Sequence, residues 1–217
     1  MDGLFLGCIA RELNAALTGA RVEKVQQPEK DELHISFRGM GGPKKLLLST
    51  SADRARVHLT ETVKPQPQEP PRFCMLLRKL IGGAKVLCVR QVGGDRILEI
   101  AFACEDEFGQ PSERILSCEV MGRHSNIILR SAEGKILDSI HHVGADISRV
   151  REVKPGLPYT PPPAQEKLDP LSPELDEAAL SRALRAGAAR LDAAIGGARS
   201  GFGREGARAM AYRLTGG

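Results

Sequence analysis

The stretch EVMGRHSNIIL, residues 119–129, places an acid, a glycine and several polar or basic side chains directly before an aliphatic run. The run from Ile127 to Leu129 is typical of a buried β-strand. Such a strand needs only its apolar members, and Gly122 interrupts the pattern before them. Two interpretations stay open: a bulge whose polar neighbours are merely solvated, or a strand end that presents functional side chains.

Further strand-like runs lie on both sides of this stretch, separated by glycine pairs, prolines and other turn signals. This rhythm indicates antiparallel hairpins. The expected strands form two meanders, residues 21–27, 33–37, 45–49 and 56–59, then 85–92, 96–104, 113–119, 125–130 and 135–141. Helical spacing predicts helices over 3–18 and 72–81. We therefore expect an α+β fold, an antiparallel two-sheet sandwich-like domain with flanking helices.

A proline-rich segment, residues 150–163, favours a stiff linker after these strands. We expect a boundary near residue 165, with one domain over 1–165 and a second over 166–217. Residues 173–184 and 188–195 are predicted helices. The string GFGREGA, 201–207, has helix-hairpin-helix spacing, in which helix amides can approach a phosphate. A glycine-rich connection without a ligand is the alternative, and we expect this second domain to be incomplete.

The composition favours a globular protein inside the cell. The chain has 217 residues, of which 41% are hydrophobic, and its net charge of +4 is too small to identify a nucleic-acid binder. The five cysteines form no CxxC pair, which indicates reduced thiols. No leader peptide is apparent, nor an apolar run of the ~20 residues that span a bilayer. We expect a soluble, cytoplasmic protein with no membrane partner.

Side chains suited to catalysis are scarce. The five His residues lack ligand spacing, and His141 and His142 are expected to point to opposite faces of a strand, one inward and one to solvent. No phosphate-binding glycine loop and no activated nucleophile stand out. We therefore expect no enzymatic activity, no metal, no cofactor and no small-molecule substrate.

Asp95 and Arg96 are the pair that suggests binding. They follow the Gly93-Gly94 turn, which places them at the edge of a hairpin. An arginine there can bind a phosphate through paired N–H groups. The alternative is an aspartate that stabilises the turn beside a solvated arginine.

Several motifs together resemble the N-terminal domain of the NFACT family. They are DGL at 2–4, PPRFCMLLRK at 70–79, GDRIL at 94–98, EVMGRHSNIIL at 119–129, and Pro155-Gly156 to Tyr159 followed by Pro161-Pro162. The resemblance covers almost all of residues 1–165. It implies a fold similar to the N-terminal domain of formamidopyrimidine-DNA glycosylases, followed by a helix-hairpin-helix segment.

The resemblance also implies a function and a site. The family's factors act in ribosome quality control: they bind the stalled large ribosomal subunit with its peptidyl-tRNA, recruit tRNA, and promote untemplated tailing, with alanine in bacteria. Alanine tRNA is therefore an expected partner. An Asp-Arg pair and a Glu-aliphatic-Met strand engage tRNA in the family, with valine here in place of isoleucine or leucine. The predicted tRNA-binding residues are Asp95, Arg96, Glu119, Val120, Met121, Arg123, His124, Ser125 and Asn126.

Within this set we expect Arg96 and Arg123 to contact phosphates or bases. Asp95 and Glu119 would orient those arginines or accept hydrogen bonds from base amino groups. Arg123 should be accessible to solvent, whereas Ile127 and Leu129 should be buried.

Two other functional classes stay as alternatives. A fibronectin-binding surface adhesin is suggested by an older label of the family, but the sequence shows no export signal and no disulfide framework. A DNA glycosylase would need an N-terminal proline amine, whereas this chain begins Met1-Asp2-Gly3.

Overall fold

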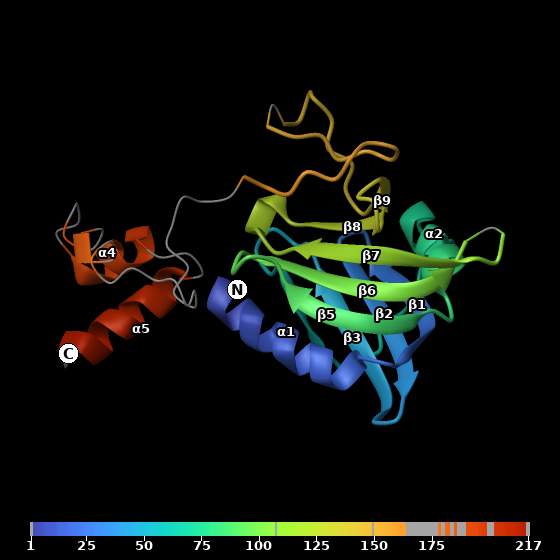
Figure 1. Ribbon diagram of the computed structural model, residues 1–217, viewed down its shortest axis with the longest axis horizontal. Coiled ribbons are helices and arrows are strands. Elements are labelled where there is room, and N and C mark those ends of the chain that lie inside the picture. The colour runs from blue at the N-terminus through green and yellow to red at the C-terminus, as the bar shows by residue number, and fades with distance from the viewer. Residues whose placement is uncertain are drawn as a thin grey trace.

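The computed structural model describes residues 2–106, 108–148, 150–163, 178, 181–182, 185, 190–198 and 202–215. Within these residues helices flank a large antiparallel sheet (Figure 1). The elements are α1 (Gly3–Leu17), β1 (Arg21–Glu29), β2 (Glu32–Gly39), β3 (Gly42–Ser49), β4 (Arg56–Leu59), α2 (Arg72–Ile81), β5 (Lys85–Gln91), β6 (Ile97–Glu105), β7 (Pro111–Glu119), the 3-10 turn η1 (Gly122–His124), β8 (Asn126–Ser131), β9 (Ile136–Ser139), α4 (Leu191–Ala198) and α5 (Arg204–Thr215). The predicted α+β class, both early helices and every predicted strand are confirmed, with shifts of a few residues at their ends.

The two predicted meanders are joined into one sheet. Among the described residues its order is β4-β3-β2-β1-β5-β6-β7-β8-β9, so the prediction of two separate sheets is wrong. The junction is short: the β1–β5 register holds a single pair, Arg21 with Lys85. Backbone bonds extend it, because Val86 N donates to Ala20 O at 2.8 Å and Val22 N to Ala84 O at 2.9 Å. The hairpin pattern in the sequence predicts only that consecutive strands pair. The contact between β1 and β5 joins strands that are not consecutive, and it depends on where α1 and α2 end.

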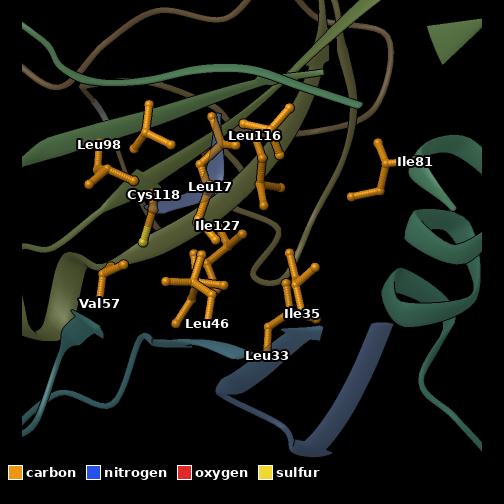
Figure 2. Close-up of a cluster of buried hydrophobic side chains, with 14 of the residues drawn as sticks. Leu17, Leu33, Ile35, Leu46, Val57, Ile81, Leu98, Leu116, Cys118 and Ile127 are labelled. Atoms are coloured by element: carbon orange, nitrogen blue, oxygen red, sulfur yellow. The ribbon is translucent and has the colours of Figure 1, made fainter. Parts of the chain in front are cut away.

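The sheet folds so that its two halves share one core. Leu33, Ile35, Leu46 and Val57 come from the first half, and they face Leu98, Leu116, Cys118 and Ile127 from the second (Figure 2). All eight are fully buried. The sandwich-like packing is therefore present although the hydrogen-bonded sheet is continuous.

Helix α1 covers the edge of β5 that β1 leaves unpaired. Its Asn14 Oδ1 accepts a hydrogen bond from Val89 N at 2.8 Å. Gln91 Nε2 donates to the Gly3 carbonyl at 2.7 Å. At the start of the helix, Asp2 Oδ1 accepts from Phe5 N at 2.9 Å and caps the first turn. The helix thus satisfies polar groups of β5 that would otherwise lack a partner.

The outer face of β6–β8 is covered by residues 140–148 and 150–163, which we call the strap. In Figure 1 it is the yellow to orange segment beyond β9. It folds on itself through the isolated bridge between Val143 and Val153, and it returns to β9 where Ile136 N donates to Leu157 O at 2.9 Å. Val153 and Tyr159 pack on Ile128 and Ile136 in a second, smaller apolar cluster. Both faces of β7 from Ile115 onward and of β8 up to Leu129 are therefore buried.

Helices α4 and α5 contact each other, and Gly203 N, just before α5, donates to Asp2 Oδ2 at 3.2 Å. The predicted helix over 188–195 appears as α4, shifted by about three residues. The predicted boundary near 165, most of the predicted helix over 173–184, and Gly201 of the helix-hairpin-helix string lie outside the described residues. That motif therefore stays a prediction. No helix in the described ranges is long and apolar enough to cross a membrane.

Candidate functional site

Asp95 and Arg96 lie in the turn between β5 and β6. Both preceding glycines have positive φ, 53° at Gly93 and 69° at Gly94, which a tight turn here requires. Asp95 Oδ1 accepts from Arg96 N at 2.7 Å, and Gln91 Nε2 donates to Asp95 O at 2.7 Å. The aspartate therefore stabilises the turn. The half-buried Arg96 guanidinium makes no hydrogen bond or ion pair with any described residue.

The second predicted element, after β7, is held beside this turn. Val120 N donates to Arg96 O at 2.8 Å. Gly122, with φ of 59°, then begins η1, so that β7 stops and the chain turns outward. Ser125 Oγ closes the turn by accepting from Met121 N at 2.8 Å. The prediction that Gly122 breaks the strand ladder is confirmed.

The turn exposes two side chains, leaves Met121 half-buried, and is followed by the buried residues of β8. Arg123 and His124 are exposed, and Arg123 Nε donates to His124 Nε2 at 3.0 Å. Ile127 and Leu129 are fully buried. The predicted accessibility of Arg123 and burial of the two aliphatic residues are both confirmed.

A cavity of about 360 Å³ lies where these elements meet, and we call it the Arg96 pocket. Asp95, Arg96, Met121 and His124 line one part of it. The strap supplies the remainder through Ser148, Val150, Arg151, Pro162 and Pro163. The structure thus brings together four of the predicted residues and adds a wall from the strap, most of which lies in the segment predicted to be a linker.

Glu119 has a different role from the predicted one. Its side chain is fully buried. Arg151 forms a bidentate ion pair with the carboxylate, in which Nη1 donates to Oε1 at 2.9 Å and Nη2 donates to Oε2. Tyr159 OH donates to Oε1 at 3.0 Å. Burial raises the pKa of the Tyr159 hydroxyl, and the adjacent Glu119 charge raises it further. Glu119 therefore orients Arg151, not Arg96 or Arg123, and it is not accessible to a base.

Three other predicted residues are also buried, and each has a structural task. Val120 belongs to the main core at 2% exposure. Ser125 closes the turn at η1. Asn126 ties β8 to the start of the strap, because its Nδ2 donates to His141 O at 2.8 Å and its Oδ1 accepts from Ile127 N at 2.9 Å. These three buried residues therefore hold the exposed residues of the site in place.

A second buried carboxylate stands on the same face of the sheet. Glu99 of β6 accepts from Arg130 Nη2 at 2.6 Å and from Arg90 Nη2 at 2.8 Å. Burial would raise the pKa of Glu99, but the hydrogen bonds from Arg130 and Arg90 outweigh it and leave the pKa below its ordinary value. The Arg130 guanidinium also lies 5.1 Å from the centre of the Tyr159 ring. The two carboxylates are thus linked through Arg130 and Tyr159.

The His pair has no metal-like arrangement. His141 is half-buried and its Nε2 lies 2.8 Å from Thr50 Oγ1, whereas exposed His142 lies 2.6 Å from Asp138 Oδ1. One ring thus points inward and one to solvent, as predicted, although both residues follow β9 and are not part of it. The described residues contain no group of three or more His, Cys, Asp or Glu side chains placed to hold a metal ion.

Comparison with known proteins identifies relatives along the whole chain. The family described as NFACT N-terminal and middle domains matches residues 2–216. The Rqc2 homolog RqcH of Bacillus subtilis is 41% identical over 177 residues, which is 81% of this chain and 31% of that protein. The ribosome quality control complex subunit NEMF of Homo sapiens is 30% identical over 101 residues, 46% of this chain and 9% of that protein.

The fold has a solved counterpart. The N-terminal domain of the fibronectin-binding protein PavA from Streptococcus pneumoniae superposes with a TM-score of 0.89 at 33% identity, covering 99% of this chain and 80% of that structure. This chain spans about a third of the length of the bacterial relatives, 31% of each. The extent of the match to the family leads to one conclusion: the chain belongs to the NFACT family.

Proposed function

We propose that this chain is the tRNA-binding N-terminal part of a ribosome-associated quality-control factor in the cytoplasm. Its partners would be tRNA, alanine tRNA in particular, and the large ribosomal subunit carrying peptidyl-tRNA. The longer factor would promote untemplated alanine tailing of stalled nascent chains. The names of RqcH and NEMF support the process, and the Arg96 pocket supports the contact with RNA.

The observation that carries the proposal is the Arg96 guanidinium, which has no hydrogen-bond or ion-pair partner in the part of the chain that the structure describes. A half-buried arginine normally finds an acceptor, because its planar fork suits paired hydrogen bonds to carboxylate or phosphate. Two other half-buried arginines of this face have such a partner, Arg130 in Glu99 and Arg151 in Glu119. Arg96 lines a cavity and has no such acceptor within the described ranges, which fits an anionic ligand group supplied from outside.

Exposed Arg123 and His124 extend this surface beyond the pocket. Phosphate contacts from such side chains fix the register of a nucleic acid and make its binding depend on salt. RNA is the polyanion that the relatives' names favour. In this reading the chain itself needs no cofactor and performs no catalysis: it binds and positions tRNA.

Titration of labelled alanine tRNA with the 217-residue chain over a range of KCl concentrations tests the proposal. Arg96→Ala is expected to weaken binding and to lower the slope of log K against log salt by about one. Arg38→Gln removes the same charge from an exposed residue that pairs with Glu23 and does not line the pocket, so it is the matched control. Equal binding by the wild type and Arg96→Ala would refute the proposal.

Fibronectin binding is the second candidate, and the similarity to the fibronectin-binding protein PavA favours it. The described residues give it no separate site. Immobilised fibronectin provides the test: saturable binding that Arg96→Ala leaves unchanged would show an adhesive surface distinct from the Arg96 pocket.

A further inference from the structure

The wall of the Arg96 pocket that the strap supplies is fixed to the sheet at one buried carboxylate. Arg151 and Tyr159 stand eight positions apart in the strap, yet both donate to Glu119 of β7. Arg151 Nη1 also donates to the Thr160 carbonyl at 2.7 Å. The Arg151 guanidinium thus connects three parts of the structure: the strap segment around Arg151, the later strap segment at Thr160, and the sheet at Glu119.

Both strap segments that this guanidinium joins line the pocket. Ser148 and Val150 lie within the three residues before Arg151, and Pro162 and Pro163 follow shortly after Thr160. On the sheet side, Glu119 is two residues before Met121, another lining residue, and Val120 N is bonded to Arg96 O. The position of the strap wall relative to Arg96 therefore depends on the bonds at Glu119.

Arg151 is poorly placed to serve as a phosphate contact itself. Its side chain is 14% exposed, and three of the five N–H donors of a guanidinium are used on Glu119 and Thr160. Its charge is opposed by the fully buried carboxylate of Glu119, which forms an ion pair with no other cation among the described residues. Arg96 has the opposite properties, since its guanidinium lines the same cavity and pairs with none of the residues that the structure describes.

We propose that Glu119, Arg151 and Tyr159 form a clamp that builds the strap wall of the Arg96 pocket, and that Arg151 positions this wall for RNA without contacting a phosphate. The clamp rests on the proposed RNA-binding function. It assigns a task to Glu119 that does not require exposure, and it adds Arg151 and Tyr159 to the residues on which RNA binding depends.

The test compares Glu119→Gln, Arg151→Lys and their double variant with Arg96→Ala and with Arg38→Gln as the charge control. Glu119→Gln keeps the shape of the side chain, and Arg151→Lys keeps the charge but cannot bind both carboxylate oxygens. Alanine tRNA affinity is measured as a function of KCl for each protein. Hydrogen exchange of strap peptides within residues 143–163 reports whether the clamp has opened, and urea unfolding reports whether each variant is folded.

Each single clamp variant is expected to bind tRNA about tenfold more weakly, with the double variant no weaker than either single one, because the two residues act through each other. The salt slope stays that of the wild type in these variants, whereas Arg96→Ala lowers it by about one. Strap amides exchange faster in all three clamp variants and at the wild-type rate in Arg96→Ala and Arg38→Gln. A variant that is only destabilised as a whole would not combine faster exchange in the strap with a wild-type salt slope.

Three outcomes overturn the clamp. Unchanged tRNA affinity in both single variants removes its link to binding. A salt slope lowered by about one when Glu119→Gln is combined with Arg151→Gln, which removes the charge that Arg151→Lys keeps, makes Arg151 a phosphate contact. Additive losses in the double variant show that the two residues act independently.

Should Arg151→Lys fail to fold, Tyr159→Phe, which removes one hydrogen bond and no charge, decides the question with an expected loss of tRNA affinity of about threefold. Absence of tRNA binding by the wild type would instead refute the proposed function.

Discussion

Glu99→Gln should destabilise the protein strongly, although it alters only one atom of the side chain. The carboxylate is 6% exposed and holds two arginines, Arg130 at 2.6 Å and Arg90 at 2.8 Å. Ser117 Oγ adds a third contact at 3.4 Å. Glutamine keeps the shape but leaves Arg130, whose side chain is 12% exposed, without a negative partner.

The magnitude follows from the burial of each pair. Breaking a buried ion pair by neutralising one partner costs about 3–5 kcal/mol, and the amide oxygen that glutamine retains favours the lower limit for Arg130. Arg90 is 57% exposed, so solvent screens its share to about 1 kcal/mol or less. We therefore expect a loss of about 3 kcal/mol at pH 7, equivalent to a fall in Tm of about 6–12 °C for a chain of this size.

Urea unfolding at several pH values measures this loss. Because the folded protein lowers the pKa of Glu99, its carboxylate stabilises the fold fully above the unfolded-chain value of 4.5, and this stabilisation is lost as the pH falls below it. The difference between wild type and Glu99→Gln should be constant from neutral pH to about pH 5 and should shrink in more acidic solution. Arg90→Gln, the control, should cost less than about 1 kcal/mol.

Two results would refute this reasoning. A loss below about 1 kcal/mol for Glu99→Gln, with an unchanged m value, would show that Arg130 is stable without its charge partner. A wild-type to variant difference that stays the same from pH 7 down to pH 3 would show that the carboxylate does not titrate with a lowered pKa.

Three further substitutions test the core, the sheet edge and the turn. Ile127→Ala removes a fully buried core side chain, and calorimetry should show a loss of about 2–5 kcal/mol; a smaller loss would mean that the two sheet halves do not share this core. Asn14→Ala leaves Val89 N without its acceptor, so urea unfolding should show about 1–3 kcal/mol and amide exchange at Val89 should accelerate. Gly122→Ala forces a side chain into the left-handed region at φ 59° and should cost about 1–2 kcal/mol, with alanine at Gly41, where φ is not positive, as its control.

Much of the fold could be predicted because its signals are local. The spacing of apolar residues in α1 and α2 and the alternation in β2 each depend on neighbours within a few positions. The junction of the two meanders depends on Ala20 meeting Val86 after two helices have ended, and no local pattern records such a contact. The predicted similarity to glycosylase domains rests on the family resemblance and stays a prediction.

The site was predicted in part for the same reason. Asp95, Arg96 and the residues around Gly122 carry turn and charge signals that stand out in the sequence. The strap does not, because residues 150–163 have the proline content of a linker. One signal could have found Arg151: Glu119 lies between Cys118 and Val120, whose side chains enter the main core, and alternation puts its carboxylate on the opposite face. If that face is also covered, a carboxylate there needs a buried cation.

This alternation along β7 also determines how mutations in the 119–129 stretch should be interpreted. Val120 packs in the main core and Glu119 under the strap, so loss of RNA binding after either is changed does not show that either touches RNA. Among the predicted binding residues, the side chains accessible to a ligand are Arg123 and His124 on the turn, with Asp95, Arg96 and Met121 in the pocket. A contact should be assigned only where a substitution changes the salt slope of binding. By that criterion Arg96 and Arg123 are expected contacts, and Glu119 is expected to act through Arg151.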